Sequence, residues 1–107
     1  MPLDEKQARQ VLIEAVDQGL ISLGESGRKA IYFHLQNIAS LVREDIPENL
    51  ETLERGLEKI FGAGAQMIEM AIIKSLYQKL DIRYEQKKIS GFARDVKEAF
   101  KMANVQH

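Results

Sequence analysis

Apolar residues recur along most of this chain at the three- and four-residue intervals that are typical of amphipathic helices. The first such stretch follows Asp4, and Gln7 three residues later completes the pattern of a capping box. A second stretch begins near Ser22, with Glu25 three residues on, or at Ser26. We expect the apolar stripes of these two helices to be Ala8, Val11, Leu12, Ala15 and Val16, and Ala30, Ile31, Leu35, Ile38 and Val42.

The next helix follows a polar connection at residues 43–48, in which Pro47 disfavours a helical conformation at Ile46. Asn49 is placed to cap this helix. Its inward positions are predicted to be Leu50, Leu53, Leu57, Ile60 and Phe61. Gly62 suits the left-handed backbone conformation that ends many helices. A last helix is predicted from the spacing of Phe92, Val96, Ala99, Phe100 and Ala103.

The segment from Met67 to Leu80 is too apolar for a helix that lies on a protein surface. Its apolar positions exceed a single stripe and comprise Met67, Ile68, Met70, Ala71, Ile72, Ile73, Leu76, Tyr77 and Leu80. Neighbours must cover this helix on most sides, and a chain of 107 residues has little material for that purpose. We therefore predict a homodimer, with an interface that includes Ile72, Leu76, Tyr77 and Tyr84.

Residues 82–86 break the helical period, because Ile82, Tyr84 and Gln86 alternate with more polar neighbours. This alternation predicts a short extended segment, which would need the same segment of another subunit to form a ladder. The predicted fold class is otherwise all-α, a compact bundle of about five helices in one domain at residues 1–107. Neither a signal peptide nor an apolar run of the roughly 18 residues of a membrane span is apparent, so we expect a cytoplasmic protein.

Charge is divided unevenly along the chain. Residues 1–73 hold 7 Lys and Arg against 12 Asp and Glu, whereas residues 74–107 hold 8 against 4. The second part could form a basic face made of Arg83, Lys87, Lys88, Arg94, Lys97 and Lys101. The simpler explanation of this uneven charge is that solvated acidic and basic faces attract one another. A net charge of -1 also disfavours nucleic acid as a partner. The acidic series Glu48, Glu51, Glu54 and Glu58 is interpreted as the solvent-facing side of the third helix.

Catalytic and ligand chemistry finds little support in the sequence. The chain has no cysteine, which excludes thiolate nucleophiles and cysteine zinc sites. His34 lacks the further ligands at i+3 or i+4 of a metal site, and we interpret it as a half-buried, hydrogen-bonded side chain. The turn at residues 62–65 lacks the Lys-Ser or Lys-Thr pair of a phosphate loop. We therefore predict no enzyme, and no catalytic residue, metal site or cofactor.

Four runs of this sequence resemble a family of small archaeal helical proteins, the Nitrosopumilus output domains of the fifth type, whose function is unknown. The runs are residues 23–35, 46–49, 57–65 and 72–77, and the most specific is Leu57-Glu58-Lys59-Ile60-Phe61-Gly62. The resemblance implies a signalling or regulatory module and supplies no catalytic residues. It also implies an acidic segment after the fourth helix, whereas this chain has Arg83, Lys87 and Lys88 there.

These observations favour a non-enzymatic signalling or regulatory interaction module that self-associates, with an unidentified protein as a further partner. One alternative is a DNA-associated transcriptional regulator that contacts phosphates through Arg28, Lys29, Arg94, Lys97 and Lys101, although no recognition motif accompanies these residues. The other alternative is a small-ligand sensor with a pocket lined by Tyr32, Phe33, Met67 and Met70. The three hypotheses differ in the surface they require, so the fold can be compared with each.

Overall fold

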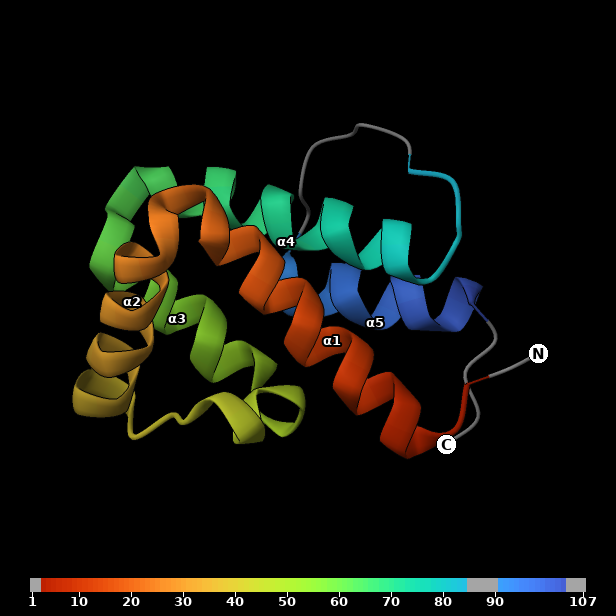
Figure 1. Cartoon of the computed structure of the whole chain (residues 1–107), viewed down its shortest axis with the longest axis horizontal. Coiled ribbons are helices and arrows are strands. Elements are labelled where there is room, and N and C mark those ends of the chain that lie inside the picture. The colour runs from red at the N-terminus through yellow and green to blue at the C-terminus, as the bar shows by residue number, and fades with distance from the viewer. Residues whose placement is uncertain (1–2, 85–90, 104–107) are drawn as a thin grey trace.

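The computed structural model describes residues 3–84 and 91–103, and these residues are almost entirely helical (Figure 1). The α-helices are α1 (Glu5–Leu20), α2 (Gly24–Ala39), α3 (Leu50–Phe61), α4 (Ala65–Lys79) and α5 (Phe92–Met102). Three short 3-10 helices join them, η1 (Ile21–Leu23), η2 (Arg43–Glu48) and η3 (Gly62–Gly64). The described residues contain no strand, which confirms the prediction of an all-α bundle of about five helices.

Helices α1 and α4 form the central pair of the bundle. They run antiparallel, because Glu14 of α1 lies 4.0 Å from the ammonium group of Lys79, whereas Gly19 near the end of α1 lies against Ile72. Helices α3 and α5 pack on α4 and on each other, and α2 lies at one end of the molecule against α1 and α3 (Figure 1). The core comprises the apolar stripes that these five helices turn toward one another.

The predicted need to cover α4 on most sides is met within one chain. Ile72 and Leu76 are fully buried and Tyr77 is nearly so, under α1, α3 and α5. The expected dimer interface through these three side chains is therefore corrected, because they belong to the core of a single chain. Tyr84 is half-buried, and its ring meets the ring of Tyr77 edge to face at 5.5 Å between centroids.

The way in which α4 ends explains part of the break in the helical spacing of apolar residues after residue 80. Asp81 takes a positive φ of 56°, and the Ile82 amide donates to the carbonyl of Tyr77 at 3.1 Å. This 6→1 bond is typical of a Schellman motif, which satisfies a free carbonyl at a helix end. Residues 82–84 form no strand, and residues 85–86 of the predicted extended segment lie outside the described residues.

Helix starts follow the sequence signals only in part. The capping box of Asp4 and Gln7 is confirmed, with both hydrogen bonds present. The predicted cap at Ser22 is wrong, because its hydroxyl donates to the carbonyl of Gly19 and α2 begins at Gly24 without a side-chain cap. Asn49 directly precedes α3 as predicted, but its side chain donates back to the carbonyl of Asp45 rather than capping.

Gly19 is required by the close contact between α1 and α4. A Cβ atom at this position would lie 2.4 Å from Ile72 Cγ1 and 2.9 Å from the backbone N and Cα of Ile72. We expect Gly19→Ala to lower the free energy of unfolding by about 1–2 kcal/mol, because forced overpacking outweighs the higher helix propensity of alanine. Denaturant titration measures this difference.

The matched control for Gly19 is Gly64→Ala. A Cβ atom at Gly64 would meet only the Cβ of Phe61, at an ordinary contact distance of 3.8 Å, and its φ is −72°. We expect this variant to be as stable as the wild type or slightly more stable, since alanine restricts the unfolded chain. Equal losses of stability at both positions would contradict the role assigned to Gly19.

Candidate functional site

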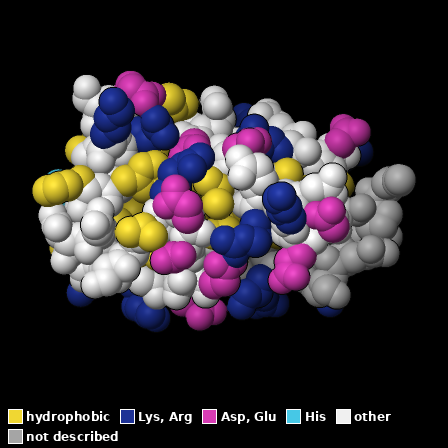
Figure 2. Space-filling view, turned by 60° about the horizontal axis from the view of Figure 1, so that its bottom comes forward, with side chains coloured by type: hydrophobic (Ala, Val, Ile, Leu, Met, Phe, Trp, Pro, Cys, Tyr) yellow, Lys and Arg dark blue, Asp and Glu magenta, His cyan; other side chains and the backbone are white. Residues whose placement is uncertain are grey.

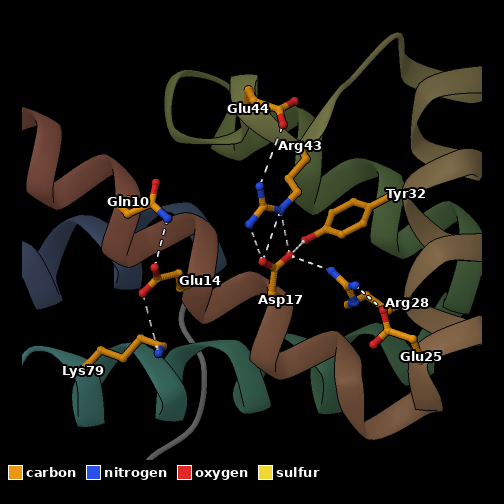
Figure 3. A network of polar contacts seen from close by, with 9 residues as sticks. All are labelled: Gln10, Glu14, Asp17, Glu25, Arg28, Tyr32, Arg43, Glu44 and Lys79. Atoms are coloured by element: carbon orange, nitrogen blue, oxygen red, sulfur yellow. Dashed lines mark hydrogen bonds and ion pairs between the residues drawn. The ribbon is translucent and has the colours of Figure 1, made fainter.

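A polar cluster centred on Asp17 joins α1 to α2 and η2 (Figure 3). Arg43 donates from Nε to both carboxylate oxygens of Asp17, at 3.0 and 3.1 Å, and from Nη2 to Oδ2 at 2.5 Å. The hydroxyl of Tyr32 donates to Asp17 Oδ1 at 2.5 Å, and Arg28 Nη1 lies 3.4 Å from the same oxygen. Arg28 also pairs with Glu25 one turn earlier. One carboxylate thus holds three segments together.

Electrostatics keep this cluster in a single charge state near neutral pH. Burial raises the pKa of Asp17, but hydrogen bonds from Arg43 and Tyr32 and the charge of Arg28 outweigh it, so this pKa lies below its ordinary value of 3.8. Burial and the Asp17 charge raise the pKa of Tyr32 above its ordinary value. The bond to Asp17 raises the pKa of Arg43. Because the carboxylate is engaged by three donors, this cluster suits a structural role rather than proton transfer.

A second contact on the same side of α1 extends this polar edge. Gln10 donates from Nε2 to Glu14 at 2.9 Å, and Glu14 faces the Lys79 ammonium of α4 at 4.0 Å (Figure 3). Both members of the Glu14–Lys79 pair are substantially exposed. Exposed pairs of this kind contribute little to stability, so we expect Glu14 to stabilise the fold much less than Asp17 does.

A solvent-open hollow lies where the end of α3, the start of α4 and the start of α5 meet. Its volume is about 610 Å³, and its lining includes Glu54, Glu58 and Glu69. Glu54 accepts a hydrogen bond from the Ala93 amide at 3.1 Å, which satisfies one free N–H at the start of α5. Glu58 is exposed. The interpretation of the acidic series as a solvated face is therefore corrected for Glu54, which is half-buried and caps another helix.

Glu69 is the unusual member of this hollow. It is only 4% exposed, and its Oε2 atom has no hydrogen-bond partner. Burial, together with the negative charges of Glu54 and Glu58, raises the pKa of Glu69 to about 7. The apolar pattern does not predict the burial of this residue, because a glutamate in an apolar helix looks like a solvent-facing position. A helical wheel that places it beside Ile72 and Ile73 would have signalled a buried charge.

A smaller hollow of about 270 Å³ lies between α1, η2, α3 and α5. Its floor is apolar and includes Leu12, Leu50 and Phe100. At its rim Arg9 contacts both Glu48 and the carbonyl of Glu44, and Lys97 pairs with Glu51, while Glu5 is exposed. It therefore presents an apolar groove whose polar rim is largely paired within the chain.

The predicted basic face is only partly described. Arg83 is exposed, and Arg94, Lys97 and Lys101 are exposed at three- and four-residue spacing on α5. Lys97 pairs with Glu51 at 3.5 Å, and Arg28 of the DNA-binding alternative is engaged by Asp17 and Glu25. Lys87 and Lys88 lie outside the described residues. These pairings reduce the free positive charge available to a nucleic acid.

The four residues proposed to line a sensor pocket do not come together around either hollow. Phe33 is 63% exposed, Met67 is also exposed, and the Tyr32 hydroxyl is bonded to Asp17. His34 is exposed rather than half-buried, with its ring 6.2 Å from that of Phe33. Figure 2 shows hydrophobic side chains among the charged ones, most of them toward the side of the molecule where α2 lies.

The outward face of α2 is uncharged at five positions, and exposed Lys29 borders it one turn before Phe33. Its exposed residues at three-, four- and seven-residue spacing are Ala30, Phe33, His34, Asn37 and Ile38. Ala30 and Ile38 were expected in the core, and the structure turns them outward because only Ile31 and Leu35 of α2 face its neighbours. Helix α2 thus has a buried stripe and a second, uncharged stripe that none of residues 3–84 and 91–103 covers.

None of the helices in residues 3–84 and 91–103 has the length and apolarity needed to cross a bilayer. No group of three or more His, Asp and Glu side chains in this part of the chain is arranged to hold a metal ion.

Compared with known proteins, the chain matches no family model, no curated protein and no solved structure.

Proposed function

We propose that this protein is a non-enzymatic interaction module that forms a homodimer through the outward face of α2. The observation that carries the proposal is the uncharged face defined by Ala30, Phe33, His34, Asn37 and Ile38, where Phe33 is 63% and Ile38 45% exposed. Large exposed apolar side chains grouped on one helix are typical of a protein-protein contact. A signalling or regulatory role is what the family resemblance alone implies.

A second copy of the chain fits this face well. A two-fold interface places the same helix of each subunit against its partner, so the uncharged positions meet one another while Lys29 lies at the edge of the face. Ala30 is small enough to let two helices approach closely, and Phe33 supplies the aromatic contact that dominates many interfaces. Exposed Glu25 and Lys29 lie on the preceding turns of α2 and mark one limit of this face.

Sedimentation equilibrium across micromolar to millimolar protein concentrations tests this proposal. We expect a dimer for the wild type, and we expect Phe33→Glu to weaken dimerisation by roughly a hundredfold, since it places like charges at the centre of the contact. Circular dichroism should show an unchanged fold, because Phe33 contributes little to the core.

Met102→Glu is the matched control for this experiment. It introduces the same charge at another apolar position that is 53% exposed, on α5 rather than α2. We expect it to leave the dimer intact. A wild type that stays monomeric throughout the range, or equal effects of the two variants, would exclude α2 as the interface.

A further inference from the structure

The hollow lined by Glu54, Glu58 and Glu69 contains a buried carboxylate oxygen that accepts no hydrogen bond. Buried polar atoms in proteins are nearly always bonded, and a buried carboxylate oxygen without a partner is among the costliest exceptions. Glu69 Oε2 is such an atom, and its side chain forms part of the wall of the hollow. A ligand that brings a donor to this oxygen would therefore gain an interaction that the chain itself leaves unmade.

The charge around the hollow selects the type of donor. Among the described residues, no Lys or Arg forms an ion pair with Glu54, Glu58 or Glu69. The start of α5 contributes Gly91 and Phe92 to the lining, which are uncharged. The described lining thus combines three carboxylates with no positive side chain, and a cationic donor meets attraction from both α3 and α4.

We propose that this hollow binds an organic cation, a primary ammonium group on a short aliphatic chain, with the ammonium donating to Glu69. A primary ammonium group has three N–H donors and no acceptor, which matches a set of carboxylate acceptors. The methyl groups of Ala63 and Ala65 line the hollow beside the carboxylates and would contact the aliphatic part. A volume of about 610 Å³ exceeds the needs of a single ion.

Isothermal titration calorimetry of 1,4-diaminobutane into the full chain at a mildly alkaline pH tests the proposal. We expect saturable binding that Glu69→Gln weakens at least about tenfold, because the amide removes the charge and keeps the shape. The uncharged analogue 1,4-butanediol should not bind. Glu58→Gln changes an exposed position and should weaken binding by a smaller factor, so it provides the same test if the Glu69 variant does not fold.

Glu98→Gln is the matched control, because it removes one negative charge from an exposed position of α5 that is absent from the lining of the hollow. It should leave the affinity unchanged, and so should Phe33→Glu, which tests the α2 interface independently. Absence of saturable binding, or equal weakening by the Glu69 and Glu98 variants, would overturn the proposal. Tighter binding of Mg²⁺ than of 1,4-diaminobutane would also overturn it in favour of a metal site.

Proton release provides a second measurement on the same complex. An ammonium group beside Glu69 favours the ionised carboxylate, so binding at neutral pH should release up to one proton. The groups that face Glu69 across the hollow are Glu54 and Glu58 of α3, whose negative charges also attract the bound cation. Titrations in two buffers of different ionisation enthalpy report the release, and its absence at every pH where binding occurs would overturn the assignment of Glu69 as acceptor.

Discussion

Replacing Asp17 with alanine should destabilise the protein by about 3 kcal/mol, which corresponds to a fall in melting temperature of roughly 10–20 °C for a domain of this size. Asp17 accepts hydrogen bonds from Arg43 and Tyr32 and faces Arg28 at 3.4 Å. Its removal leaves two guanidinium groups close together without their shared counter-charge. Thermal unfolding followed by circular dichroism measures the effect.

The expected loss exceeds that of an ordinary surface ion pair, because the Asp17 side chain is only 21% exposed. Hydrogen bonds to charged groups contribute about 1.5–3 kcal/mol each when buried, and the 35% exposure of the Arg43 side chain reduces that figure. The lowered pKa of Asp17 makes its contribution fully present above about pH 4, and the contribution disappears as the pH falls through the folded-state pKa. The wild type and the alanine variant should therefore converge in stability in strong acid.

Glu14→Ala is the matched control, since it removes a carboxylate from the same helix one turn away. Its partner Lys79 lies 4.0 Å distant, and the Glu14 side chain is about half exposed, so the expected loss is below about 1 kcal/mol. A double-mutant cycle with Tyr32→Phe should give a coupling energy with Asp17 and none with Glu14. Equal losses for the two acidic residues would contradict the role of Asp17 as the link between α1, α2 and η2.

Local patterns were sufficient to predict several elements of this fold. Helix α3 begins immediately after Asn49 and ends at Phe61 before a glycine of positive φ, as its stripe and Gly62 indicate. Helix α5 begins at Phe92 as expected. The capping box at Asp4 depends only on residues within one turn, so the sequence alone determines it. In each case the information lies within a few neighbouring residues.

Errors arose where packing between distant segments decides the outcome. The helical period alone predicts Ala30 and Ile38 in the buried stripe of α2, yet both face outward because α2 lies at one end of the bundle and contacts neighbours on one side only. Gly19 permits the close approach of Ile72, which lies in another helix and more than 50 residues away in the chain. Neither the end position of a helix nor a close approach between two helices leaves a local signal in sequence.

The polar sites were the least predictable part of the structure. Asp17 lies 15 residues from Tyr32 and 26 residues from Arg43 in the chain, and no spacing rule connects them. The hollow depends on the packing of α3 against α4, which brings Glu54 and Glu58 toward a glutamate of another helix. The sequence predicts Glu54 and Glu58 on the third helix, which the structure confirms, but the neighbours of all these residues depend on the tertiary fold.

Glu69 should make the protein less stable as the pH rises, and Glu69→Gln should remove this dependence. The pKa of Glu69 is raised to about 7 in the folded chain from an ordinary value of 4.5. Between these two values the native state holds a proton that the unfolded state has lost, so the free energy of unfolding falls as the pH rises through that window. The total cost above neutral pH is about 3 kcal/mol.

Urea titrations of the two proteins from about pH 4.5 to 8, in a phosphate buffer free of amines, measure this effect. The glutamine variant resembles the protonated carboxyl in shape, so the two proteins should be equally stable near pH 4.5, and the variant should exceed the wild type by roughly 2–3 kcal/mol at pH 8. Glu98→Gln should follow the wild type throughout. If the free energies of unfolding of the wild type and the glutamine variant ran parallel across this pH range, Glu69 would ionise as an exposed residue does. If the wild type gained stability as the pH rose, a cation of the chain itself would already pair with Glu69.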